Sequence, residues 1–248
     1  MRYIQKDPAR VPEAYTALLK ARGYDKESLL QPGATTLTGP EIYDEISTSS
    51  DFQKPFKKLK KVLLKEQGYV CAYCGRRIPE NSKNPKCVTE HVSPKSLHKE
   101  LAGEYMNFVM SCQGNATRDP HTPSEEKGDD RLHCDAHKKN EEIKISPLQP
   151  TCADHFNYNL KGKVIVDSSD ADAVSTRDIL NLNEGALRID RENAIAPYVW
   201  KDKSSSTFYS IEELKVFKES LSRLDVNGKY TPFYFVIINV IDKLIGER

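Results

Sequence analysis

The chain has 248 residues, of which 37 are basic and 36 acidic, so its net charge is +1 with histidine neutral. This length allows one large domain or two small ones. The balanced charge excludes nucleic-acid binding through an overall positive field and leaves only a local patch. The most apolar run, Phe233 to Ile241, is shorter than the about 20 residues that cross a bilayer. Residues 1–8 lack the apolar stretch of a secretion signal. We therefore expect a cytoplasmic protein with no membrane partner.

Two helices are predicted in the first third of the chain. Residues Val11 to Arg22 suit a helix that begins near Pro12 and ends before a glycine. Residues Phe56 to Gln67 have apolar side chains on one face at helical spacing. The other face is either an ordinary solvated surface or a stripe that contacts phosphate groups. Its basic residues are Lys57, Lys58, Lys60, Lys61 and Lys65.

Beyond residue 145 the patterns predict mainly helices. Residues 161–166 suggest a short strand of a hairpin, and Thr176 to Leu182 suggest a turn that leads into a helix. Ile211 to Leu224 has the pattern of an amphipathic helix. Pro232 to Ile245 is very apolar and rich in β-branched and aromatic residues, so it could be a helix or a pair of strands. This last segment is either core or a docking surface for a partner protein.

The cysteine spacing indicates a metal site. In a reducing compartment, six cysteines are not typical of a disulfide framework. Cys71 and Cys74 form a CxxC pair followed by glycine, which is typical of one half of a zinc knuckle. A redox role would need a thioredoxin-like setting, which is not predicted here. Spacing alone leaves three candidates for the second half: Cys112, Cys134 and His137.

Polar residues between these cysteines indicate an enzyme. Glu90 and His91 follow a predicted strand, and Asn107 stands in a second predicted strand. Asp135 lies at the start of a predicted helix. An acid–histidine pair, an asparagine and a polar helical residue in this order form the ββα-metal arrangement, and here the sequence resembles the HNH endonuclease family.

A more specific resemblance extends from about residue 56 to about residue 185. The segments CAYCGRRI, EHVSPKS, MNFVMSC, HCDAHKKN and SPLQPTCADHF together resemble the PtuB-like HNH nucleases of retron-associated and Septu anti-phage defence systems. The resemblance implies an endonuclease, a hydrolase of phosphodiester bonds, that cuts DNA and works with an ATPase partner.

The site residues follow from the resemblance and from their chemistry. His91 is the expected general base, since an ordinary histidine pKa near 6.5 suits proton abstraction at neutral pH. Glu90 and Asp135 are expected to bind Mg²⁺ or another divalent cation, because hard oxygen donors suit hard cations. Asn107 would orient His91 or tie the two strands together. The remaining expected roles are phosphate contacts by Lys95 and Lys138 and a structural Zn²⁺ on Cys71, Cys74, Cys112 and Cys134.

The sequence departs from the family pattern in two places. Glu90 replaces the usual aspartate, and an insertion of residues 113–133 separates Cys112 from Cys134. The fourth zinc ligand is therefore open between Cys134 and His137. The third residue of the catalytic metal site is likewise open between Asp135 and His137.

The expected fold is α+β and mainly α, with a central ββα-metal module and its zinc knuckle between helical parts. The expected division is an N-terminal helical segment (1–55), the nuclease module (56–145) and a mainly helical C-terminal region (146–248) that could bind a partner. Two other functions remain open. The chain could be a non-catalytic zinc module that binds nucleic acid or protein, or an HNH nuclease that acts on RNA such as tRNA.

Overall fold

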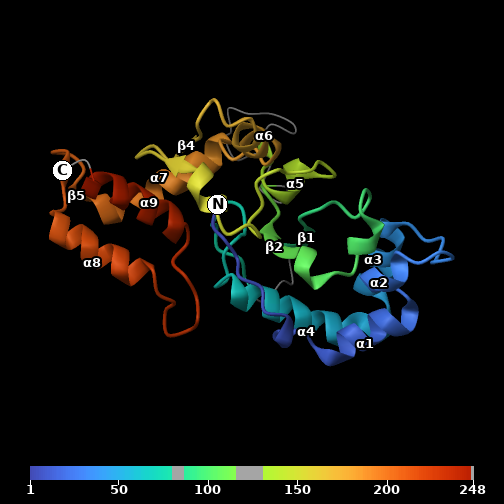
Figure 1. The fold of residues 1–248 in the computed structure, drawn as a ribbon. Coiled ribbons are helices and arrows are strands. Elements are labelled where there is room, and N and C mark those ends of the chain that lie inside the picture. The colour runs from blue at the N-terminus through green and yellow to red at the C-terminus, as the bar shows by residue number, and fades with distance from the viewer. Residues whose placement is uncertain (80–86, 116–130, 247–248) are drawn as a thin grey trace.

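The computed structural model describes residues 1–79, 87–115 and 131–246, and the following description is limited to them. The fold is α+β, with helices and three small antiparallel sheets of two strands each. In Figure 1, helices α1–α4 lie on one side of the molecule and α7–α9 on the other, with the hairpin of β1 and β2 between them. The mainly helical α+β class is confirmed.

Among the N-terminal helices, α4 packs its apolar face on β2, and α1 and α3 pack on α4. Both predicted helices are confirmed, the second as the end of the longer helix α4. The buried face of α4 includes Phe52, Phe56, Leu59 and Leu63, whereas the lysine face is mostly exposed. The bounds are α1 Glu13–Arg22, α2 Lys26–Leu29, α3 Gly39–Thr48 and α4 Ser50–Glu66.

The central hairpin joins β1 (Cys87–His91) to β2 (Phe108–Cys112), with His91 opposite Phe108 and Cys87 opposite Cys112. Every residue of β2 is buried. Asn107 was predicted inside the second strand, but it is the last residue of the 3-10 helix η3 (Tyr105–Asn107), directly before β2. The short helix α5 (Asp135–Lys138) begins at the position that the sequence predicts for a helix.

The C-terminal part is built on three longer helices that pack against one another. The predicted turn from Thr176 to Leu182 is wrong in its first half, because α6 continues to Ile179 and the turn comes after it. The closing apolar segment is the helix α9. The bounds are β3 Asn157–Tyr158, β4 Val164–Ile165, α6 Ala171–Ile179, α7 Gly185–Val199, β5 Trp200–Asp202, β6 Thr207–Phe208, α8 Ile211–Leu221 and α9 Tyr234–Gly246.

One cluster of buried apolar residues runs through all of these parts, from α1 to α9. Helix α4 crosses the predicted boundary at residues 55 and 56, and the division into three segments stays a prediction. Among the described residues, no helix combines the length and the apolar composition that a membrane crossing requires.

Candidate functional site

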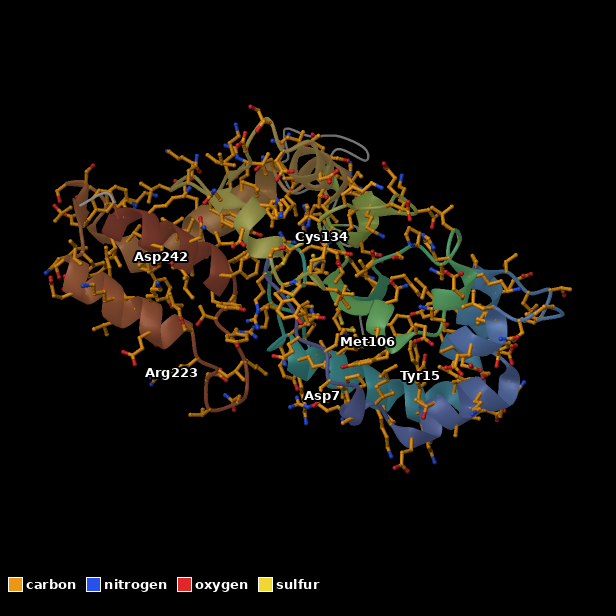
Figure 2. All side chains as sticks on the ribbon, viewed as in Figure 1. Asp7, Tyr15, Met106, Cys134, Arg223 and Asp242 are labelled. Atoms are coloured by element: carbon orange, nitrogen blue, oxygen red, sulfur yellow. The ribbon has the colours of Figure 1, made fainter. Side chains whose placement is uncertain are left out.

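Four cysteines from three separate segments meet in the middle of the molecule, where Figure 2 labels Cys134. Cys71 and Cys74 lie in the loop after α4, Cys112 ends β2, and Cys134 precedes α5. All four ligand atoms lie within 4.8 Å of one another and all four residues are buried. The Sγ atoms of Cys71 and Cys134 are 3.9 Å apart, and those of Cys74 and Cys112 are 3.7 Å apart.

These separations match the chemistry of zinc. Sulfur ligands at about 2.3 Å from a tetrahedral ion lie about 3.8 Å from one another. The buried four-cysteine group could therefore hold a metal ion such as zinc. It contains Cys134 and not His137, whose Nδ1–H donates to the carbonyl of Ile179 at 2.8 Å.

Backbone amides already donate to this group. The amide of Cys112 donates to Cys71 Sγ at 3.3 Å, and that of Arg76 donates to Cys74 Sγ at 3.4 Å. Gly75, which lies between Cys74 and Arg76, has φ +83°, and a Cβ there would lie 2.8 Å from the ring of Phe235. Only glycine fits this turn without strain. Burial alone would raise the pKa of Cys71, but hydrogen bonds from the other three thiols hold it well below its usual range.

His133 is a neighbour of this group that the sequence analysis missed. Its Nδ1 lies 3.1 Å from Cys134 Sγ and 3.9 Å from Cys112 Sγ. Burial lowers the pKa of His133 to about 3, so the ring is neutral and can donate one hydrogen bond to sulfur. Its position next to Cys134 in the chain is the one signal that could have identified it.

A second polar cluster lies where β1 ends and α5 begins. Glu90 and Asp135 share a hydrogen bond, and Glu90 is 5% exposed. The pKa of Asp135 is raised to about 8, first by burial and then by the hydrogen bond and the negative charge of Glu90. Glu90 is buried and Asp135 is half-buried, and two carboxyl groups this close hold a proton between them unless cations neutralise both. The pair is therefore suited to a divalent cation.

Lys138 and Tyr73 contact the same carboxylate. The ammonium of Lys138 lies 2.8 Å from Glu90 Oε1 and donates to the carbonyl of His91 at 3.0 Å. The hydroxyl of Tyr73 donates to Glu90 Oε1 at 3.1 Å. Lys138 is fully buried, so its ammonium is turned inward to Glu90, and its contact with phosphate stays a prediction.

His91 lies beside this cluster in an apolar setting. Its ring packs edge to face against Tyr43 and Phe108, with centroids 4.5 and 4.9 Å away. Nε2–H donates to the carbonyl of Ala102 at 3.0 Å, so Nδ1 carries the lone pair of the neutral ring. Burial lowers the pKa of His91 to about 4, in contrast to the value near 6.5 expected from the sequence.

Asn107 holds the loop that follows His91. Its Oδ1 accepts from the amide of Ser93 at 2.8 Å. Its Nδ2 donates to the carbonyls of Ser93 and Leu101 at 2.9 and 3.3 Å. Asn107 therefore fixes both ends of the loop that carries Lys95 and presents Ala102 to His91.

Two side chains from outside the motifs complete this cluster. Tyr43 comes from α3, and its ring lies 5.0 Å from Lys95 Nζ as well as against His91. Burial raises the pKa of Tyr43 to about 12 and keeps the hydroxyl neutral. Tyr73 stands between the first two cysteines, where the sequence indicates only a spacer. Neither residue carries a signal in a single sequence, because only the fold brings it to Glu90 and His91.

Comparison with known proteins adds two relatives, whereas no family model matches. The chain is 25% identical over 173 residues to "Retron Vc95 putative HNH endonuclease" from Vibrio cholerae serotype O1 biovar El Tor, covering 66% of this chain and 76% of that protein. It is 31% identical over 139 residues to "Septu protein PtuB" from Bacillus thuringiensis, covering 55% of this chain and 44% of that protein. The resemblance to the HNH proteins of these defence systems is confirmed.

Proposed function

We propose that the chain is a metal-dependent HNH endonuclease that hydrolyses DNA phosphodiester bonds as the effector of an anti-phage defence complex. One observation carries the proposal. Glu90 and Asp135, from a strand and a helix that are distant in sequence, come together beside His91 closely enough that Glu90 raises the pKa of Asp135. A purely structural zinc module has no need of two carboxyl groups at this position, because Lys138 compensates only Glu90 and the second carboxylate costs stability until another cation neutralises it.

In this proposal β1, β2 and α5 form the ββα-metal module, and the four cysteines bind a structural Zn²⁺ that holds the ends of β2 and α5 together. Glu90 and Asp135 hold the catalytic divalent cation. When bound, that ion supplies charge stabilisation at the scissile phosphate. His137 donates to the carbonyl of Ile179 and does not join Glu90 and His91. Asp135 is therefore the preferred third residue of the catalytic metal site.

His91 takes the role of general base. Its neutral ring carries the lone pair on Nδ1, the atom that would accept a proton from water, since Nε2–H is already held by Ala102. A pKa near 4 keeps the ring unprotonated throughout the neutral range. Tyr43 and Phe108 restrict its rotation, and Asn107 fixes the loop that supplies the Ala102 carbonyl.

The partner and the substrate are inferred from the relatives. Septu and retron names indicate systems of several components, and we propose an ATPase as the protein that acts together with this chain. DNA is the proposed substrate, and the half-buried Lys95, rather than the fully buried Lys138, is the lysine proposed to contact its phosphates.

The test is cleavage by the full chain with its ATPase partner and Mg²⁺, on plasmid DNA and on total RNA in parallel. His91→Ala should reduce DNA cleavage by about 10²–10⁴-fold, the usual contribution of a general base. His98→Ala is the matched control, since His98 lies outside the cluster and pairs with Glu142. Equal rates for His91→Ala and wild type would refute the mechanism. Cleavage of RNA alone would move the proposal to the RNA substrate, and no cleavage of either with zinc bound would favour a non-catalytic module.

A further inference from the structure

Five exposed lysines of helix α4 form a single stripe along its outer face. Their order along the helix, at 3.6 residues per turn, places them within an arc of about 100° around its axis. The first and the last are eleven positions apart, which corresponds to about 16 Å along the axis. This lysine stripe consists of Lys54, Lys57, Lys58, Lys61 and Lys65.

The lysine stripe points away from the candidate active site. The opposite face of α4 is buried, and on it Phe56 packs edge to face against Phe108, with ring centroids 6.3 Å apart. Phe108 in turn packs on the ring of His91, so the inner face of α4 supports the site and the outer face is exposed. Lys60 lies outside the stripe, because it is half-buried and its ammonium is 4.5 Å from the ring centroid of Phe56.

The acidic residues of α4 do not compensate the charge of the stripe. Asp51 and Glu66 are the two acidic residues of this helix, and both already have a cationic partner. Asp51 pairs with Arg22 at 2.7 Å, and Glu66 pairs with Lys6 at 3.5 Å. Lys61 set aside, no lysine of the stripe forms an ion pair within the described part of the chain.

This pattern differs from that of an ordinary solvated helix face. Such a face mixes both signs, because opposite charges three or four positions apart stabilise a helix and like charges destabilise it by a similar amount. In the stripe, Lys54 faces Lys58 and Lys57 faces Lys61 at a spacing of four. A row of cations that is retained despite this repulsion is complementary to a polyanion. Over about 16 Å, one strand of a DNA duplex carries about five phosphates, which is one for each lysine.

We propose that the lysine stripe binds the phosphate backbone of duplex DNA outside the cleavage site, without reading its sequence. The inference rests on DNA as the substrate in the proposed function but not on cleavage. Lysine ammonium groups contact phosphates as point charges, and phosphate contacts carry no sequence information. Because the stripe faces away from Phe108 and His91, the DNA that it binds is a segment other than the one at the site.

The test measures binding of a labelled DNA duplex to the full chain by fluorescence anisotropy, without Mg²⁺ and in the His91→Ala background, so that no DNA is cut. With all five lysines of the stripe replaced by glutamine, the plot of log affinity against log salt should lose about four to five units of slope. The loss should be the same for duplexes of unrelated sequence. Glutamine resembles lysine in helix propensity, so α4 should stay folded, which circular dichroism checks.

A matched control removes the same charge from another surface. Glutamine at five exposed lysines of the C-terminal part should leave the salt slope close to that of wild type, and these lysines are Lys161, Lys163, Lys201, Lys203 and Lys215. Within α4, Lys58→Gln should reduce the slope by about one unit. Lys60→Gln should not change it, since Lys60 lies outside the stripe.

Cleavage gives a second readout when His91 is intact and Mg²⁺ and the ATPase partner are present. At saturating DNA the five-glutamine variant of the stripe should cut at the wild-type rate, because the stripe does not contact the site. It should need more DNA to reach half of that rate, because its affinity for DNA is lower. A lower rate at saturation with an unchanged half-saturating concentration would contradict a role in binding alone.

The remaining outcomes separate this proposal from the nuclease mechanism. An unchanged salt slope in the stripe variant, or an equal loss in the matched control, would overturn the proposal and leave the mechanism intact. If the slope is unchanged but the variant no longer co-purifies with the ATPase partner, the stripe is a protein interface and the proposal is wrong. Absence of DNA binding by the wild-type chain at low salt would also overturn it. If the slope falls as expected but the chain with His91 intact cuts no DNA, the nuclease mechanism is wrong and the stripe stands.

Discussion

The Lys138 ammonium lies 2.8 Å from Glu90 Oε1, and both side chains are almost entirely buried. An ion pair removed from water is stable only as long as both partners remain, because either one alone is a buried and uncompensated charge. Lys138 is therefore an internal cation that holds Glu90 in place at the point where we propose that a divalent ion binds.

Lys138→Met should lower the free energy of unfolding by about 3–5 kcal/mol, since it leaves the Glu90 carboxylate buried without its partner. Urea unfolding in the absence of divalent ions measures the effect. The double variant Lys138→Met/Glu90→Gln should recover much of this loss, because it removes the orphaned charge as well. Additive losses in the double variant would mean that the two side chains are not energetically coupled.

Asp135 should give the apoprotein an unusual pH dependence. Its pKa is raised from 3.8 to about 8 in the folded state. Between these values the folded chain keeps a proton that the unfolded chain releases, so the free energy of unfolding falls as pH rises through this window. Asp135→Asn should flatten that fall, and saturating Mg²⁺ should also flatten it by favouring the ionised carboxylate. Unfolding curves at several pH values measure this dependence of the free energy of unfolding on pH. Asp44→Asn changes an exposed carboxylate and is the control. The same pH slope in Asp135→Asn as in wild type would contradict the prediction.

Cys112→Ser should abolish tight zinc binding and unfold the hairpin end, because a structural zinc site contributes directly to folding. Zinc content and thermal unfolding of the purified chain measure both effects. The matched control is Cys87→Ser, since Cys87 pairs with Cys112 across the hairpin but lies outside the four-cysteine group. Loss of zinc in both variants would indicate that disruption of the hairpin, and not loss of a ligand, causes the effect.

Tyr43→Ala should slow DNA cleavage by at least about tenfold, because the ring that restricts His91 is lost and small displacements of a catalytic group are costly. It should also destabilise the fold by up to about 3 kcal/mol, the lower end of the range for a fully buried aromatic side chain, because Tyr43 is only partly buried. Tyr43→Phe keeps the ring and should restore stability and most of the activity. If Tyr43→Phe were as slow as Tyr43→Ala, the hydroxyl and not the ring would be the important group.

The sequence predicts the parts of the site that lie within local motifs. Spacing alone brings Cys71 and Cys74 into consideration, with Cys112, Cys134 and His137 as candidates for the second half. Apolar periodicity identifies α4 and α8 because burial on one face leaves a regular pattern. The end of α6 is less predictable, since Thr176 has low helix propensity but its hydroxyl accepts from two backbone amides in the folded chain.

The remainder of the site depends on tertiary packing. The pKa of His91 follows from its burial between Tyr43 and Phe108, and no local pattern reports that burial. The inward direction of Lys138 depends on where β1 lies relative to α5. Arg191 looks like any helical arginine until the fold encloses it. Each of these properties arises from residues distant in the chain, which a single sequence does not relate to one another.

The register of the hairpin has a consequence for how this protein can vary. Cys112 at one end of β2 belongs to the cysteine group, and Phe108 at the other end packs on His91. A shift of one residue would turn every side chain of β2 to the opposite face and would disrupt both clusters in a single step. The five-residue length of strand β2 therefore fixes the distance between the two clusters, and we expect insertions to be tolerated only beyond its two ends.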